Sequence, residues 1–365
     1  MKNEESTFYG EITAEEKAAL LNFQERINTD TGELEQPKTH LQTAPILNVW
    51  YSTKLSNDDY HNSELTFANE PLRKILSASK LKACTTPLHF RRAFQRGFDN
   101  NMNLNNGSAL HTMILEPEKF EYELFDDSKI IEKIRDERPE ILNVKSTKEY
   151  KEWFSKYKNA DGELRDNVLT KEAFSTMWML KKKLADDEVV QSLFASSERE
   201  SSLFVSFAGI NVKVRPDALK IASATDEKHL SKFDVKQGDL VIISVKTTID
   251  ASPAGFLKQC ARLRYNLTEA FYYDIIERYA RYAVIIAPKN NVHTIFLTLE
   301  KDKNEFTGHY LLRPATDGFI AWGRHDYSQN LNVFMSTTEF SEGYEAINGG
   351  STVCEISAPG GNYGK

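Results

Sequence analysis

The chain has 365 residues, of which 40% are hydrophobic and 27% charged, and a formal net charge of −7. This length and apolar fraction are enough for one large folded domain or two ordinary ones. The acidic balance argues against a protein that coats nucleic acid nonspecifically. It does not exclude an acidic metal site with local phosphate contacts.

Neither a membrane span nor a signal peptide is expected. No apolar run is long enough to cross a bilayer, and the first residues are polar and acidic. The three cysteines, Cys84, Cys260 and Cys354, are scattered without metal-type spacing. These features predict a cytoplasmic protein with reduced thiols.

Residues 1–57 are predicted to form an N-terminal accessory arm. A helical pattern over 14–27 is followed by a polar, turn-rich linker. Residues 58–335 would form the main domain, and residues 336–365, which contain several glycines and serines, a loose C-terminal tail.

A basic region follows from residue 77. Ser77–Ser79 can cap a helix starting at Lys80, and a second short helix is expected over 89–97. Its cations make this the most basic patch in the first third of the chain; they are Lys80, Lys82, Arg91, Arg92 and Arg96. A patch of this kind is ordinarily a solvated helix face, and the alternative is a surface that binds DNA phosphates.

The segment over 106–117 is predicted to be a helix that carries His111. His111 and Leu115 are four residues apart and share a helix face, which directs the histidine inward. Such a histidine is usually a hydrogen-bonded core residue, and its functional alternative is a metal ligand. Residues 118–197 are then predicted to form a charged, helical insertion. Its expected core residues are Trp153, Phe154, Phe174, Trp178, Met179 and Leu184.

The next part of the chain is predicted to be a sheet. Strands over 200–207 and 210–221 form a hairpin that delivers Asp217. The run over 240–248 is a strand buried on both faces, and its alternation places Ser244 and Lys246 on one face. A helix over 254–279, a second hairpin of strands over 282–288 and 292–299, and a helix over 314–334 follow. This order predicts an α/β fold with a mixed central sheet flanked by helices.

Four of these blocks together resemble a known family. They are Gly107–His111 (GSALH) with LEP at 115–117, Arg215–Asp217 (RPD), VKTTIDASP at 245–253, and the helix segment from Tyr265 to Asp274. In this order they resemble the exonuclease VIII-type branch of the PD-(D/E)XK nucleases, over roughly residues 58–335. Each block alone is a weak signal, and their order makes the likeness specific.

The resemblance implies a restriction-endonuclease-like core and magnesium-dependent digestion of linear duplex DNA from its ends, 5′ to 3′. It further implies homo-oligomers and a single-strand annealing protein as a partner in phage-type recombination. By position, Asp217 matches the principal metal ligand, His111 the histidine near the metal, Lys246 the catalytic lysine, and Glu200 a glutamate that precedes the hairpin.

Two positions depart from the family pattern. Its Asp-x-Lys is here Ser244–Lys246, and its Gln-x3-Tyr is here Thr268–Tyr272. A neutral hydroxyl is a poor ligand for Mg²⁺ or Mn²⁺. Three routes could compensate: a displaced carboxylate from Glu269, one from Glu200, or weak binding of one metal ion by His111, Asp217 and the carbonyl of Val245.

Three hypotheses therefore stay open. The first is a nuclease, either weakened or rescued by a displaced carboxylate, with catalytic Lys246, Asp217 and Glu269 and metal ligands His111, Asp217 and Glu200. The second is an inactive relative that binds DNA ends or a protein partner, and the third is a purely structural Lys246–Asp217 pair. In the first two, the candidate DNA contacts are Arg91, Arg92, Arg96, Lys258, Arg262 and Arg264.

Overall fold

The computed structural model describes residues 39–86, 89, 105–160, 162, 165, 167–207, 209–302 and 305–336, and the short strands β1 (Arg26–Ile27) and β2 (Leu34–Glu35). The predicted helix over 89–97 and the tail after residue 336 fall outside these ranges, apart from residue 89. Of the predicted helix over 14–27, only the last two positions are described, and they form β1.

A five-stranded sheet contains the long buried strand that the sequence predicts. Its order is β15 (Glu305–Pro314), β14 (Val292–Asp302), β13 (Leu240–Thr248), β12 (Ala218–Ile221) and β9 (Glu198–Arg199). Strands β13 and β14 pair in parallel, whereas the other neighbours are antiparallel, so the sheet is mixed.

A second, four-stranded sheet lies beside it, with the order β3 (Ile46–Ser52), β10 (Ser202–Phe207), β11 (Ile210–Val214) and β6 (Leu76–Ser77). The predicted β10–β11 hairpin is confirmed. Strand β3 comes from the segment assigned to the accessory arm, yet it pairs antiparallel with β10 along its whole length. This part of the arm therefore belongs to the folded body.

The chain passes from one sheet to the other at Arg215–Asp217. The sequence predicts one strand over 210–221, but the structure splits it into β11 and β12 in different sheets. Pro216 explains the break, because proline has no N–H to continue a ladder of hydrogen bonds. The mixed α/β class is confirmed, and most of the strands divide between these two larger sheets.

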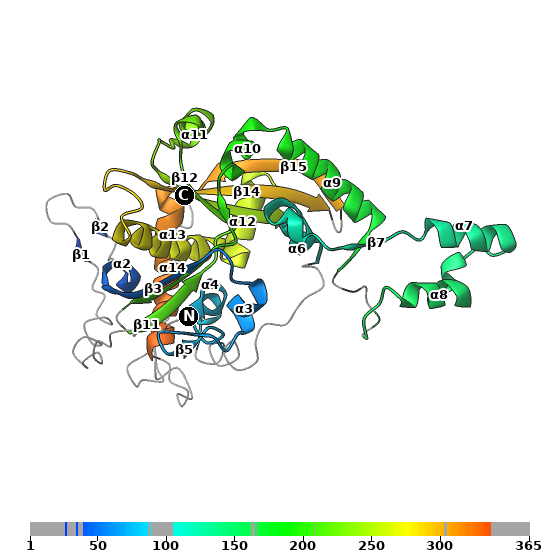
Figure 1. Ribbon diagram of the computed structural model, residues 1–365, viewed down its shortest axis with the longest axis horizontal. Helices are drawn as coiled ribbons and strands as arrows, with labels where there is room; N and C mark the ends of the chain where they lie inside the picture. The colour runs from blue at the N-terminus through cyan, green and yellow to red at the C-terminus, as the bar shows by residue number, and fades with distance from the viewer. Residues whose placement is uncertain are drawn as a thin grey trace, which may run out of the picture.

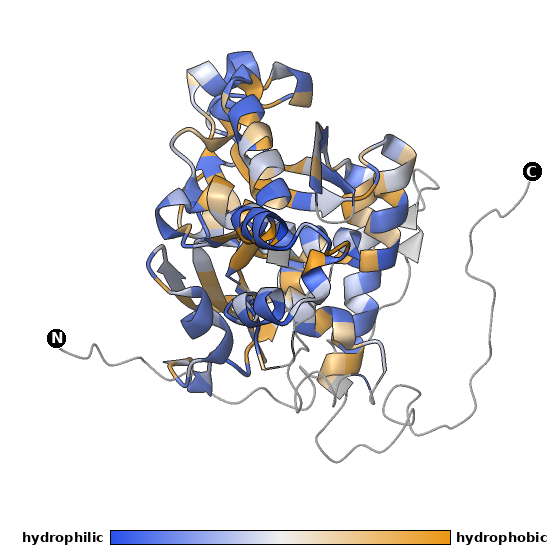
Figure 2. Ribbon diagram, turned by 90° about the vertical axis from the view of Figure 1, so that its right-hand side faces the viewer, coloured by the Kyte–Doolittle hydropathy of each residue, from blue (hydrophilic) through white to orange (hydrophobic). Residues whose placement is uncertain are grey.

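Helices cover both faces of the five-stranded sheet (Figure 1). Along β13, Leu240 and Ile242 pack with residues of α4 (Ala78–Ala83), α13 (Tyr265–Tyr282) and α14 (Asp317–Ser336). Val241, Ile243 and Val245 pack on the opposite face with α6 (Asn105–Leu115), α9 (Lys171–Ala185) and α10 (Glu188–Phe194). Hydrophilic and hydrophobic residues alternate along these helices, as expected for elements with one buried side (Figure 2).

Two sequence predictions after β13 are wrong. The predicted helix over 254–279 is two helices, α12 (Pro253–Leu263) and α13, because Arg264 between them is left-handed with φ 53°. The predicted strand over 282–288 is the end of α13 and a turn, in which the side chain of Val284 is 83% exposed. A β-branched pattern without burial does not specify a strand.

The helical insertion projects from the body of the molecule (Figure 1). The parallel pair β7 (Glu123–Phe125) and β8 (Val168–Thr170) forms its base, and α7 (Ser128–Glu137) and α8 (Lys148–Ser155) form its tip around a small core of their own. On α9, Trp178 and Met179 are 54% and 62% exposed, so their predicted place in the core is wrong.

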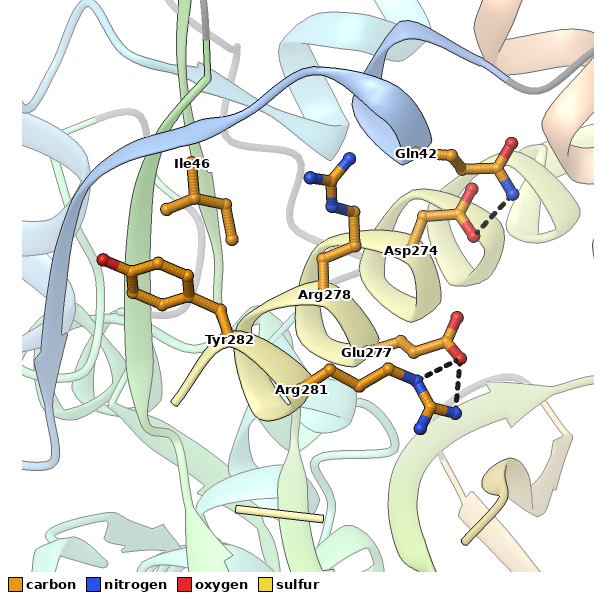
Figure 3. A pocket seen from close by; sticks show the side chains of 7 residues that line it. All are labelled: Gln42, Ile46, Asp274, Glu277, Arg278, Arg281 and Tyr282. Carbon is orange, nitrogen blue, oxygen red and sulfur yellow. Dashed lines mark hydrogen bonds and ion pairs between the residues drawn. The ribbon is translucent and has the colours of Figure 1, made fainter. Parts of the chain in front are cut away.

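The N-terminal part of the described chain is fixed to α13 by polar contacts. The guanidinium of Arg278 donates to the carbonyls of Leu41 and Ala44, which caps the C-terminal end of α2 (His40–Thr43). Beside it, Gln42 donates to the buried Asp274 at 3.4 Å (Figure 3). Arg278 therefore helps to hold α2 in place, whereas Arg281, which also lines this pocket, donates to Glu277 and to the carbonyl of Asn290 after α13.

The remaining elements are short. They are α3 (Asn57–Asn62), β4 (Thr66–Phe67), β5 (Glu70–Pro71), α11 (Ala224–His229), and the 3-10 turns η2 (Pro117–Lys119), η3 (Val144–Ser146) and η4 (Ser231–Phe233). Cys84 and Cys260 are buried free thiols. Across the described residues, no helix combines the length and apolar character that crossing a membrane requires.

Candidate metal centre

Asp217 lies where β12 begins, directly beside β13. Because Ala218 pairs with Ile243 in an antiparallel register, the preceding Asp217 falls next to Ser244 and Val245. Its carboxylate accepts a hydrogen bond from the backbone N–H of Val245 and lies 3.6 Å from the Lys246 ammonium. Strand pairing therefore holds the aspartate and the lysine of the predicted site side by side.

His111 approaches Asp217 and Val245 from α6, which packs on the face of the sheet opposite to α13. Its Nε2 lies 3.2 Å from the carbonyl oxygen of Val245 and 3.6 Å from Oδ2 of Asp217. Gly107 brings the start of α6 close to β13, since a Cβ at this position would lie 3.5 Å from Oγ1 of Thr247. The histidine is thus placed against the strand end and away from the apolar core.

Glu200 completes the group from the loop between β9 and β10. Its backbone has a left-handed φ of 49°, and its N–H donates to the carbonyl of Asp217 at 3.2 Å. Its carboxylate oxygen lies 3.8 Å from Nδ1 of His111. A non-glycine residue held in this conformation costs free energy and is enriched at functional sites.

These three residues form a group that could hold a metal ion. One ligand atom from each of His111, Glu200 and Asp217 lies within 4.8 Å of the others. One imidazole nitrogen and two carboxylate oxygens suit a divalent cation of the first transition row, and the Val245 carbonyl adds a further oxygen. The donor set could hold a divalent metal ion, and it does not identify which one.

The charges of the group favour a cation as well. Burial lowers the pKa of His111, but the carboxylates of Asp217 and Glu200 raise it, and the net pKa lies above the ordinary value. The imidazole therefore attracts a proton in the site, and a metal ion would compete with that proton.

Lys246 and Glu269 form a second, deeper layer. The Lys246 ammonium lies 3.6 Å from Oε1 of Glu269, whose side chain is 2% exposed on α13. Burial lowers the pKa of Lys246, yet Asp217 and Glu269 outweigh it and raise the pKa above its ordinary value. The lysine is consequently held charged between two carboxylates.

Ser244 directs its hydroxyl to this buried glutamate. Ser244 Oγ donates to Oε1 of Glu269 at 2.8 Å. Burial raises the pKa of Glu269, while Lys246 and the Ser244 hydrogen bond oppose the rise. A carboxylate from α13 thus meets the side chain at the position where the family pattern has an aspartate. Glu200 lies within the metal-capable group, and Glu269 lies beneath it.

The second departure from the family pattern is Thr268, whereas Tyr272 keeps the residue type of that pattern. Thr268 lies within hydrogen-bonding distance of the Arg264 carbonyl, one turn earlier in its own helix, at 3.5 Å. Tyr272 is partly buried and packs against the core between α13 and the sheets, where burial raises its pKa. Tyr265 packs against the small cluster of Phe256, Cys260 and Phe296, and it also helps to line the site.

An open cleft of about 470 Å³ gives access to the group. Its lining includes His111, Glu200, Lys246, Thr247 and Tyr265, and also Asn57 from the segment assigned to the arm. The sequence offered no signal for Asn57, because its place depends on the nonlocal pairing of β3 with β10.

The predicted DNA contacts fall into three groups. Arg91, Arg92 and Arg96 lie outside the described residues. Lys258 and Arg262 are exposed on α12. Arg264 donates to the carbonyl of Lys82 and to Asn330, so its guanidinium already serves the packing of α4 and α14.

Comparisons with known proteins give little beyond this geometry. Neither a protein-family model nor a curated protein matches the chain. Among solved structures, the chain is similar to a protein from Eubacterium rectale described as a "putative exonuclease", with 13% identity and a TM-score of 0.44. The match covers 84% of this chain and 96% of that chain. A likeness at this level carries no inference about activity.

Proposed function

We propose that the chain is a metal-dependent nuclease that hydrolyses linear duplex DNA from its ends. The observation that carries the proposal is the metal-capable group of His111, Glu200 and Asp217 beside a lysine held charged. A divalent ion, Mg²⁺ or Mn²⁺, would supply an activated water and neutralise charge that develops on the phosphate. The residue types and the cleft are consistent with phosphodiester hydrolysis.

Each side chain has a definite task in this proposal. Asp217, fixed by the N–H of Val245, holds the metal and orients Lys246. The Lys246 ammonium contacts the scissile phosphate or the attacking water, because its charge is maintained by Asp217 and Glu269. Glu269 takes the place of the carboxylate that Ser244 lacks, by fixing the serine and the lysine from beneath.

The finer features follow from the family resemblance and remain part of the proposal. They are digestion from 5′ to 3′, homo-oligomers, a single-strand annealing partner, and a role in phage-type recombination. A linear duplex labelled at either end, incubated with Mg²⁺ or Mn²⁺, tests the activity and its polarity together. Circular duplex of the same sequence is the control, and its equal degradation would contradict an end-dependent enzyme.

An exchange of residues tests the displaced carboxylate. Glu269→Gln should lower the cleavage rate on the order of 10–100-fold, as for other residues that orient a metal site from behind. Ser244→Asp alone should lower it too, because two buried carboxylates would then face each other. The double variant Ser244→Asp/Glu269→Gln should recover activity, since it moves the acid from α13 to β13.

A different outcome would favour a second function. Glu269 lies beneath the metal-capable group and not within it, which is the observation that favours an inactive protein that binds DNA ends. If only the double variant cleaves DNA, the unmodified chain is an inactive protein that binds DNA ends. If Glu269→Gln retains full activity, Glu269 has no part in catalysis.

The exposed cations of α12 should contribute to DNA binding without sequence preference. Lys258→Ala with Arg262→Ala should weaken binding to unrelated duplexes by similar factors and reduce the slope of log K against log salt by about 2. Fluorescence anisotropy at several salt concentrations measures both effects. The control pair is Lys228→Ala with Lys232→Ala, which are exposed on α11 and η4. Sequence-dependent losses would argue against phosphate contacts.

A further inference from the structure

Two lysines share the aromatic ring of Tyr265. The ring lines the cleft, and the Nζ atoms of Lys246 and Lys82 each lie 5.5 Å from its centroid. Lys246 comes from β13, whereas Lys82 comes from the last turn of α4. A second cation therefore stands next to the catalytic layer, on an element far away in the sequence.

The backbone of Lys82 is held firmly in this place. Its carbonyl accepts hydrogen bonds from Arg264, at the junction of α12 and α13, and from Asn330 on α14. Asn330 also donates to the carbonyl of Leu81 at 2.7 Å. The end of α4 is thus fixed to two neighbouring helices, and the lysine side chain starts from a defined point.

The ammonium of Lys82 has no anionic partner among the described residues. Its side chain is half-buried, and no described carboxylate or carbonyl oxygen lies within ion-pair or hydrogen-bond distance of Nζ. Burial, together with the nearby charges of Lys246 and Arg264, lowers the pKa of Lys82 to about 8, against an opposing effect of Glu269. A partly desolvated cation without a partner costs free energy unless an anion meets it.

We propose that Lys82 binds a DNA phosphate adjacent to the scissile phosphate, and that Tyr265 lies between the two phosphate positions. Two cations, Lys82 and Lys246, share this ring, and Glu269 is engaged by Ser244 and Lys246. A further phosphate would supply the missing negative charge. This inference rests on the proposed nuclease function and adds a binding residue to it.

The test compares Lys82→Met and Lys82→Arg with Lys228→Met, an exposed lysine on α11 beyond the far end of β12 from Asp217. Binding of a linear duplex is measured by anisotropy without divalent metal, and kcat and KM are measured with Mn²⁺. Lys82→Met should weaken binding several-fold on any sequence, reduce the salt slope by about 1, and raise KM. Lys82→Arg should retain binding.

The melting temperature separates binding from structure. Because Lys82 lacks an acceptor in the described fold, Lys82→Met should not lower Tm, and Lys82→Gln serves as a second variant if methionine disturbs α4. If the variants that remove the charge bind DNA with the affinity and salt slope of Lys228→Met, the Lys82 subsite is wrong while the nuclease stands. If the unmodified chain neither cuts nor binds duplex DNA, the proposed function itself fails.

Discussion

Asp217→Ala is expected to abolish metal-dependent cleavage of linear duplex DNA. The loss should be on the order of 10³-fold, the scale observed when a main electrostatic group of an active site is removed. The substitution removes one of three grouped ligands, the anion facing Lys246, and the acceptor for the N–H of Val245. Cleavage of an end-labelled duplex in Mn²⁺ gives the rate, and calorimetric titration with Mn²⁺ gives the metal affinity.

The matched control is Asp136→Ala, which removes an exposed aspartate of α7 far along the projecting insertion. It should leave both the rate and the metal affinity unchanged. Cleavage that survives in Asp217→Ala while the unmodified chain binds metal would contradict the assignment of the centre. Loss of cleavage with unchanged metal affinity would move the ligand role from Asp217 to Glu200 and His111.

We expect Asp226→Asn to lower the free energy of unfolding by roughly 3–5 kcal/mol. This is the largest loss among the polar substitutions proposed for this chain. Lys220 and Asp226 form a buried ion pair at 2.8 Å, with side chains 4% and 6% exposed. The carboxylate also accepts from Ser192 and from the N–H and hydroxyl of Ser223, which caps α11. Asparagine would leave the lysine charge buried without a counterion. Urea unfolding measures the change.

The Lys220–Asp226 pair also accounts for part of the loss of stability at acidic pH. Burial raises the pKa of Asp226, but hydrogen bonds from Lys220, Ser192 and Ser223 lower it to about 2, below the ordinary 3.8. Since the folded-state pKa is the lower one, this stabilisation is present above about pH 4 and is lost as the pH falls toward 2. Asp226→Asn should lack that part of the pH dependence.

The control for Asp226→Asn is Glu152→Gln, in an exposed pair with Lys148. It should change the free energy of unfolding by less than about 1 kcal/mol.

The strand end could be predicted from the sequence because its determinants are local. A continuous apolar run and a period of two place Ser244 and Lys246 on one face, and the structure directs both toward α13. Asp217 required one further assumption, that its strand end lies beside β13. The register of β12 with β13 satisfies this assumption, although the strand before it belongs to another sheet.

The choice between Thr268 and Glu269 could not be made in the same way. Successive residues of a helix point about 100° apart, so the side chain that faces β13 depends on where α13 begins. The left-handed Arg264 sets that start, and an arginine gives no sequence signal for such a break. The place of β3 was equally hidden, because its partner β10 follows some 150 residues later, and pairing over such a distance leaves no local pattern.

The two sheets meet at the metal-capable group in a particular manner. Glu200 lies where the chain leaves β9 for β10, and Asp217 lies where it returns from β11 to β12, so each carboxylate occupies a crossing between the sheets. A hydrogen bond from the Glu200 N–H to the Asp217 carbonyl joins the two crossings. A cation bound by both Glu200 and Asp217 would link the two sheets. Its binding would be coupled to their mutual orientation, and a shift of one sheet against the other would release it.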